Sequence, residues 1–196
     1  MQLFKTKYNE LSDELLFDKM SQGNSKAFDE LYSRYAQMLI RYFYRMIRRD
    51  KEKAEDFVHD IFTKLIQKPE LFDSSRSFKT WIFSVANNMC KNEYKKLEVR
   101  KNIHSADDSW LSVQDDQTNV FHEVHDQLFK EAYDSAIEQL ELKHKEVFEM
   151  RHMDGLAIKE IAEILQINEG TIKSRLFYAT KHLANHLKEF NPLIEV

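Results

Sequence analysis

The sequence has little of what disulfide scaffolds, β-rich folds or membrane proteins contain. Among 196 residues there are 1 cysteine, 3 glycines and 2 prolines. The single Cys90 excludes an internal disulfide and a cysteine-rich zinc site, and scarce glycine and proline disfavour a fold built from many tight turns. No apolar run approaches the roughly 20 residues of a membrane span, and the N-terminus lacks the apolar core of a signal peptide. We therefore expect a cytoplasmic, helical protein without membrane insertion.

The charges are segregated along the chain, although the formal net charge is only -4. Arginine and lysine are concentrated in residues 34–53 and 171–188, whereas residues 104–126 contain acidic residues and no lysine or arginine. Clustered cations are typical of surfaces that bind nucleic acid. The acidic segment is also rich in polar uncharged residues, which is typical of a poorly ordered linker. Trp110, Leu111 and Val113 within it either dock on a partner or form a loosely packed surface patch.

Apolar residues recur at intervals of three and four on both sides of this segment, as amphipathic helices require. Before it, the pattern predicts helices over residues 27–39, 54–66 and 78–97. After it, the pattern predicts helices over residues 132–140, 147–154, 158–165 and 172–187. We therefore predict an all-α fold of two small helical domains, at residues 1–98 and 127–196, joined by an acidic linker at residues 99–126.

The segment from Ala157 to Ala179 predicts a helix-turn-helix in the second domain. Small Ala162 allows another helix to cross closely, and apolar residues bracket a short turn before Thr171, which can begin the next helix. Gln166 stands at this turn, where a positive φ costs a residue with a side chain about 1 kcal/mol. The apolar spacing is otherwise that of a helix held out from the body to enter the major groove of DNA.

The outward face of the second helix carries cations and hydrogen-bonding groups, which suit phosphates and base edges. Arg175 can chelate a guanine edge, while Lys173 and Lys181 hold the phosphate backbone. The alternative is an ordinary solvated helix face. The candidate DNA-binding residues here are Thr171, Lys173, Ser174, Arg175, Phe177, Tyr178 and Lys181.

The run GLAIKEIAEILQINEGTIKSRLFYATKHL, at residues 155–183, resembles the region 4 helix-turn-helix of bacterial sigma-70 family sigma factors of the extracytoplasmic function (ECF) group. The runs AEDFVHDIFTKL, at residues 54–65, and FKTWIFSVANN, at residues 78–88, resemble region 2 of that family. The resemblance implies a promoter-recognition subunit that is not an enzyme and needs no cofactor. It implies three partners: core RNA polymerase (clamp and flap), promoter DNA and an anti-sigma factor.

The resemblance also implies roles for residues of the first domain. The surface that docks on the polymerase clamp corresponds to Asp56, His59, Asp60 and Phe62. The loop from Lys68 to Phe78 corresponds to the one that captures a flipped promoter base. The helix that reads and melts the -10 element corresponds to Asn87, Asn88, Lys91, Asn92, Lys95 and Lys96. In the docking surface the family often has Gln where His59 stands, so that contact does not transfer. Because the family often has Arg at 87 and Asp at 92, the preferred promoter sequence does not transfer. The second domain would read the -35 element.

Two other functions fit parts of the sequence. A polymerase-independent helix-turn-helix regulator would bind duplex DNA by itself, and a helical adaptor would bind only protein. Trp81 either stacks on a base or packs in the core, and the arginines at 41, 45, 48 and 49 either contact nucleic acid or solvate a helix. The histidines at 122, 125, 144 and 152 lack a carboxylate in a defined register, so no metal site is expected.

Overall fold

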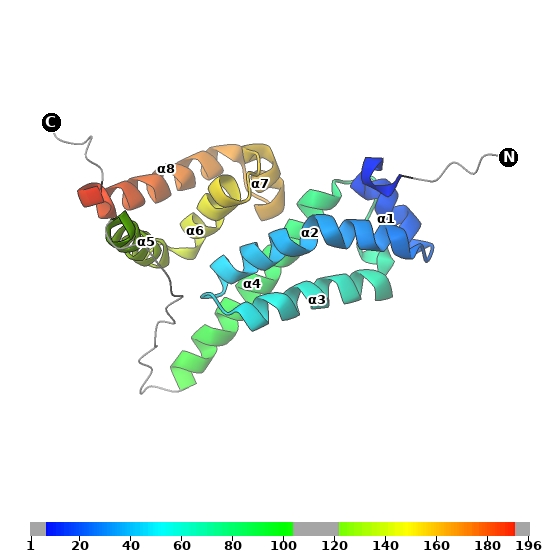
Figure 1. The fold of residues 1–196 in the computed structure, drawn as a ribbon, viewed down its shortest axis with the longest axis horizontal. Coiled ribbons are helices and arrows are strands. Elements are labelled where there is room, and N and C mark those ends of the chain that lie inside the picture. Colours follow the sequence, from blue (N-terminus) through cyan, green and yellow to red (C-terminus); the bar gives the residue numbers. More distant parts are fainter. Residues whose placement is uncertain (1–6, 104–121, 191–196) are drawn as a thin grey trace. The chain divides into compact units, whose positions relative to one another are not determined.

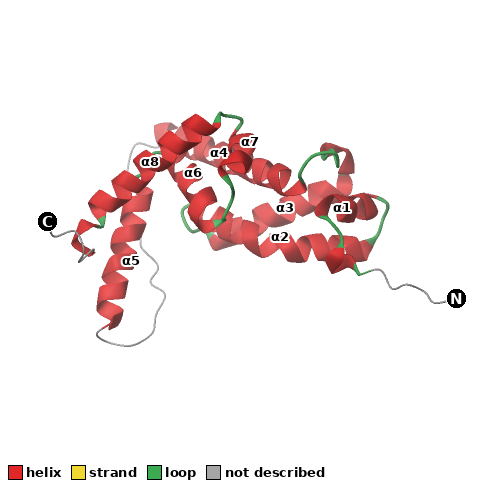
Figure 2. Cartoon of the chain, turned by 90° about the horizontal axis from the view of Figure 1, so that it is seen from above, coloured by secondary structure: helices red, strands yellow, loops and turns green. Residues whose placement is uncertain are grey.

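The computed structural model describes residues 7–103 and 122–190 of the chain (Figure 1). Every regular element in these residues is a helix, and they contain no strand (Figure 2). The described part of the chain has no helix that is both long enough and apolar enough to cross a membrane. The predicted all-α fold class is confirmed.

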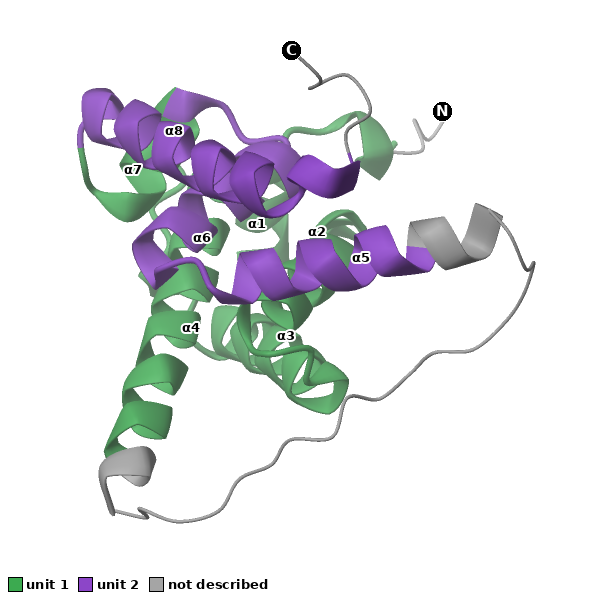
Figure 3. Cartoon of the chain, turned by 90° about the vertical axis from the view of Figure 1, so that its left-hand side faces the viewer, with its two compact units in different colours: residues 1–99, 159–167 green, residues 100–158, 168–196 purple. Residues whose placement is uncertain are grey.

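The chain divides into two compact units, which Figure 3 colours separately. Unit 1 comprises residues 1–99 and 159–167, and unit 2 comprises residues 100–158 and 168–196. The helices of unit 1 are α1 (Asp13–Ser21), α2 (Ser25–Met46), α3 (Lys51–Gln67), α4 (Phe78–Ile103) and α7 (Ile158–Leu165), with short 3-10 turns at Tyr8–Glu10 and Pro69–Leu71. Unit 2 contains α5 (His122–Glu138), α6 (Leu142–Phe148), a π-turn (Glu149–Met153), α8 (Glu169–His186) and a 3-10 turn (Lys188–Phe190).

Short polar residues begin the first three helices of unit 1. The side chains of Ser12, Asn24 and Asp50 accept hydrogen bonds from backbone N–H groups in the first turns of α1, α2 and α3. Such caps satisfy donors that have no partner within the helix. Gly23 adopts a φ of +88° between α1 and α2, a conformation that glycine reaches without strain.

The core of unit 1 is rich in aromatic rings. Tyr42 and Phe43 of α2 are fully buried, and their rings pack edge-on against Phe83 of α4 and Phe57 of α3, at centroid distances of 5.5 and 5.1 Å. Edge-to-face contacts at these distances are favourable beyond the area that they bury. The rings therefore fasten α3 and α4 to the central helix α2.

Unit 2 is built around α8, which packs against α5 and α6. The buried side chains that form its core are Ala136, Ile137, Leu140, Phe148, Ala179 and Leu183. They come from α5, α6, α8 and, for Leu140, the turn between α5 and α6. α8 therefore presents one face to this core and leaves its other face to solvent. This arrangement decides which α8 residues are available to a partner.

The turn between α7 and α8 spans residues 166–168. Gln166 adopts a φ of +56°, so the positive φ expected at this position is confirmed. The backbone N–H of Ile167 donates to the carbonyl of Ala162 (3.1 Å), and the Asn168 side chain caps α8 by accepting from Thr171 N–H (2.8 Å). The turn is thus closed by hydrogen bonds on both sides.

Helices cover both ends of the predicted linker. α4 continues to Ile103 and α5 begins at His122, beyond the boundaries of 98 and 127 that the sequence pattern predicts. The centre of the predicted linker, including Trp110, Leu111 and Val113, lies outside the described residues.

Candidate nucleic-acid interface

The solvent face of α8 carries five of the seven residues that the sequence predicts to bind DNA. Exposed side chains on this face are Lys173, Ser174, Phe177, Tyr178 and Lys181. Phe177 is 62% exposed and Tyr178 is 57% exposed, and their rings lie 5.6 Å apart in an edge-on arrangement. Adjacent exposed rings form an apolar patch, and contiguous apolar patches can mark interaction surfaces. The face combines two cations with apolar rings, which suits phosphates together with base edges.

Arg175 and Thr171 lie differently from these five residues. Arg175 Nη1 donates to Glu146 Oε1 of α6 at 3.2 Å, and the two side chains are 22% and 4% exposed. The Thr171 hydroxyl donates to Asn168 Oδ1 (3.0 Å), within the capping turn. Glu146 occupies Nη1 of Arg175, so a two-point contact with guanine either uses the other guanidinium nitrogens or replaces this bond.

α4 presents a polar stripe that matches most of the residues predicted to read the -10 element. Asn88, Asn92, Lys95 and Lys96 are exposed at a spacing that places them along one side of the helix, and Lys91 is half-buried. Asn87 departs from the expectation, because it is only 2% exposed and its Oδ1 accepts a hydrogen bond from the Tyr42 hydroxyl (3.1 Å).

The burial of Asn87 follows from its position on α4. It stands four residues after Phe83 and three before Cys90, both fully buried, so it shares their inward face. Asn87 therefore accepts the hydrogen bond of a buried tyrosine hydroxyl and does not face solvent.

The outer face of α3 carries three of the four residues predicted to contact polymerase. Asp56, His59 and Asp60 are exposed. Ile66 is 56% exposed and lies one heptad beyond His59, on the same side of the helix. The sequence pattern places Ile66 in the core stripe, so the structure adds an apolar position to this acidic face.

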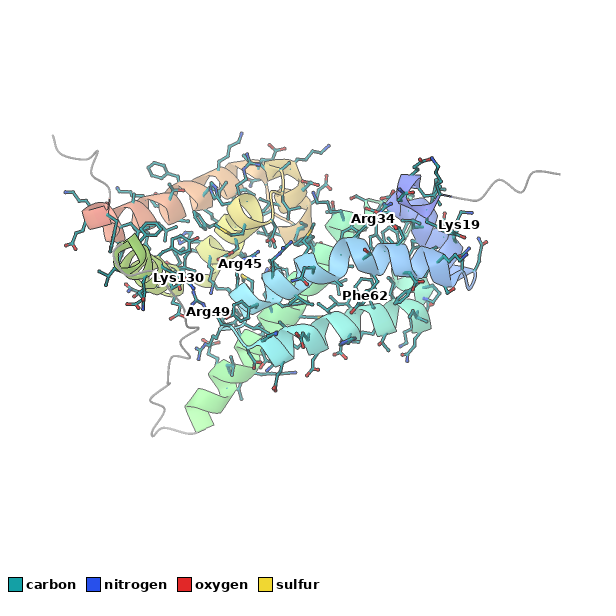
Figure 4. All side chains as sticks on the ribbon, viewed as in Figure 1. Lys19, Arg34, Arg45, Arg49, Phe62 and Lys130 are labelled. Carbon is teal, nitrogen blue, oxygen red and sulfur yellow. The ribbon has the colours of Figure 1, made fainter. Side chains whose placement is uncertain are left out.

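Phe62 is the exception on α3. It is 2% exposed and its ring lies 4.8 Å from Tyr32 and 5.9 Å from Phe28, both on α2 (Figure 4). The ring of Phe62 thus lies in the α2–α3 contact and not on the outer face of α3 with the other three residues. Its packing holds α3 against α2.

The segment between α3 and α4 alternates buried rings with exposed polar residues. Phe72 is buried and lies 5.2 Å from the rings of both Phe78 and Trp81. These contacts favour core packing over base stacking as the role of Trp81. Residues 73–77 between the rings are all exposed. Hydrogen bonds from the Ser75 hydroxyl and then from its backbone N–H lower the pKa of Asp73.

The described residues contain no group of three or more His, Cys, Asp or Glu side chains arranged to hold a metal ion. Cys90 is buried.

Comparison with known proteins shows the family to which the chain belongs. The Sigma-70 region 2 family model matches residues 31–100, and the Sigma-70 region 4 model matches residues 130–183. The ECF RNA polymerase sigma factor SigL of Mycobacterium tuberculosis is 34% identical over 160 residues, covering 81% of this chain and 88% of SigL. The chain belongs to the ECF group of RNA polymerase sigma factors.

Other relatives agree with this family. The ECF sigma-E factor of Haemophilus influenzae is 28% identical over 187 residues, covering 91% of this chain and 97% of that protein. Two solved structures share the fold with a TM-score of 0.66. CnrH, in complex with the cytosolic domain of CnrY, is 19% identical and covers 91% of this chain and 99% of its own. The sigma factor RpoE of Bartonella quintana, in complex with the anti-sigma factor NepR, is 21% identical and covers 83% and 98%.

Membership of the ECF group decides among the functions that the sequence left open. This sigma factor directs promoter-specific initiation by RNA polymerase and is not an enzyme. The polymerase-independent regulator and the protein-only adaptor are not favoured. The comparisons show the family and do not assign individual residues to polymerase or to DNA.

Proposed function

We propose that the sigma factor divides its work between two domains, at residues 1–98 and 127–196, joined through residues 99–126. The first domain docks on core RNA polymerase and opens the -10 element, and the second reads the -35 element. One observation carries this proposal. Lys173, Phe177, Tyr178 and Lys181 are exposed on one side of α8, and the opposite side of the helix is apolar and buried.

The polymerase-binding surface is the exposed face of α3. Asp56, His59 and Asp60 supply charge and hydrogen-bonding groups, and Ile66 supplies an apolar contact at the end of the same stripe. Specific protein contacts usually combine apolar and polar groups. Phe62 supports the surface from beneath.

The promoter-opening surface combines α4 with the segment before it. The α4 residues that bind the single DNA strand of the opened -10 element are Asn88, Asn92, Lys95 and Lys96. The loop at residues 68–77 holds a base that has left the base stack. Unstacking a base costs a few kcal/mol, which a pocket and cationic backbone contacts must offset. No nucleotide hydrolysis is needed for this step.

The partners of the protein follow from the same proposal. It acts in the cytoplasm, where core polymerase and promoter DNA are found, and an anti-sigma factor holds it inactive. Support for the last point comes from CnrH and RpoE, whose structures were solved with the cytosolic domain of CnrY and with NepR.

Reconstitution with sigma-free core polymerase tests the proposal. The purified chain should make core polymerase initiate selectively, and Asp56→Arg should abolish this because a cation replaces an exposed carboxylate on the docking face. Asp29→Arg is the matched control, since Asp29 is an exposed carboxylate on α2 of the same unit. Equal initiation by Asp56→Arg and the parent would remove α3 from the docking surface.

A further inference from the structure

Helix α1 lies outside the region that matches the sigma-70 region 2 model, which begins at residue 31. It nevertheless contacts the loop between α3 and α4. The Phe17 ring of α1 packs edge-on against Phe72 at 4.8 Å and lies 6.1 Å from Phe78. Phe72 and Phe78 are the buried residues on either side of the exposed segment 73–77, so one side chain of α1 reaches both ends of that segment.

A second residue of α1 fixes the end of the loop through the backbone. Glu14 Oε1 accepts a hydrogen bond from the N–H of Phe78 (3.0 Å), the first residue of α4. Ser77 Oγ accepts from Thr80 N–H (3.3 Å) in the same turn. The first N–H groups of a helix have no partner within it, so the start of α4 is capped by one residue of its own loop and one from α1.

The position of α1 is in turn fixed on α2. Asp13 accepts hydrogen bonds from the Tyr35 hydroxyl and from Arg34 Nη1, the latter at 2.7 Å. Arg34 (Figure 4) also bonds Glu30 Oε1 (2.8 Å) and the carbonyl of Leu11 (3.0 Å). Burial, followed by the hydrogen bond to Asp13, raises the pKa of Tyr35. α1 is therefore anchored independently of the loop that it contacts.

We propose that α1 is a brace for the loop at residues 68–77, and that Glu14 is a positioning residue for capture of the flipped promoter base. The inference rests on the proposed function of that loop. α1 contacts both Phe72 and Phe78, so it fixes the positions of the two ends of the exposed segment 73–77. A loop that is ordered before the base arrives loses less conformational freedom on binding, so the base is held more tightly.

Fork-junction DNA tests this proposal with the complete holoenzyme. The probe is a promoter fragment used by the holoenzyme, with a single-stranded non-template -10 strand, prepared intact and with each base removed in turn. With the native sigma factor, removal of the captured base should weaken binding about 10-fold more than removal of its neighbours, as expected for one well-held base. With Glu14→Ala, intact DNA should bind about 10-fold more weakly and the sensitive position should disappear.

Two variants separate positioning from general destabilisation. Glu14→Gln keeps an oxygen that accepts the Phe78 hydrogen bond, so it should retain the sensitive position. Asn24→Ala removes the cap of α2, where Asn24 Oδ1 accepts from Ala27 N–H (3.1 Å), and it should also retain that position.

A sensitive position that persists in Glu14→Ala would overturn the inference and leave the loop's proposed function intact. If the native holoenzyme shows no sensitive position, both the role of α1 and the proposed function of the loop are wrong. Binding of each variant to core polymerase, measured first, establishes that the variant is folded.

Discussion

Arg175 of α8 and Glu146 of α6 form an ion pair at 3.2 Å in which the carboxylate side chain is only 4% exposed. Arg175 follows buried Ile172 by three residues and precedes buried Ala179 by four, so it lies at the edge of the inward face of α8. The pair connects α8 to α6. Arg175 therefore contributes to the placement of α8, including the solvent face that we propose binds DNA.

Replacing Arg175 by alanine should destabilise unit 2 by on the order of 2 kcal/mol, because the nearly buried Glu146 carboxylate loses the charged hydrogen bond from Arg175. Hydrogen exchange of the α6 and α8 amides should speed up accordingly. Adding Glu146→Leu should restore much of the protection, since an apolar side chain then replaces the carboxylate that has lost this bond. If Arg175 instead reads guanine, the double variant will regain protection and still fail at the promoter.

Lys173→Ala should weaken promoter binding by the holoenzyme and make its salt dependence shallower by about 0.9 in the slope of log K against log salt, as for one lost phosphate contact. Lys130→Ala, an equally exposed lysine on α5, is the control and should leave the slope unchanged. Measuring affinity over a series of salt concentrations gives both slopes. Identical slopes for the two variants would take Lys173 out of the interface.

Phe177→Ala should lower promoter affinity by about 1–3 kcal/mol with little loss of stability, because the ring is 62% exposed and contacts bases only in the complex. Leu183→Ala is the opposite case. Leu183 is 5% exposed in the core of unit 2, so its truncation should cost about 2–5 kcal/mol of stability. Thermal unfolding and promoter binding, measured on both variants, should separate the two effects; a large fall in Tm for Phe177→Ala would show the ring to be structural.

His144 should make unit 2 less stable in acid. Burial lowers the pKa of His144, and the neighbouring cations Lys143 and Arg175 act in the same direction while Glu141 opposes them. Since the folded pKa lies below the unfolded value of about 6.5, stability is constant above that value and falls as the pH drops through it. Hydrogen exchange of α6 and α8 at about pH 7.5 and pH 5, corrected for intrinsic rates, should show the loss in the parent and a smaller one in His144→Gln.

Gln166→Gly should stabilise the helix-turn-helix by up to about 1 kcal/mol, because glycine reaches a positive φ without the steric cost that a side chain incurs. The φ of +56° at Gln166 is the observation behind this. Ala184→Gly, at an exposed position within α8, should lower stability by as much as about 1 kcal/mol. A scan of thermal unfolding checks the opposite signs; destabilisation by both glycines would mean that Gln166 makes a compensating contact.

Helical periodicity indicates which candidate site residues face inward better than residue type does. The residue types of Asn87 and Arg175, and the motif that contains Phe62, suggest contacts with a partner, yet all three side chains lie on or beside inward faces. The spacing of apolar residues around them already indicates this: Phe62 adjoins buried Ile61 and follows buried Val58 by four. Where spacing and residue type disagree, the spacing agrees with the structure at these positions.

The sequence by itself determined the helical class, the approximate extent of most helices, the left-handed residue in the turn at Gln166 and the exposure of most polar residues on α3, α4 and α8. These features depend on neighbours within a few residues, where a helix repeats every 3.6 residues. Only the tertiary structure decided which partners the inward polar groups meet. Arg175 meets Glu146 across 29 residues, Asn87 meets Tyr42 across 45, and Phe78 meets Glu14 across 64. Such pairs depend on how the helices cross, and no local spacing contains that information.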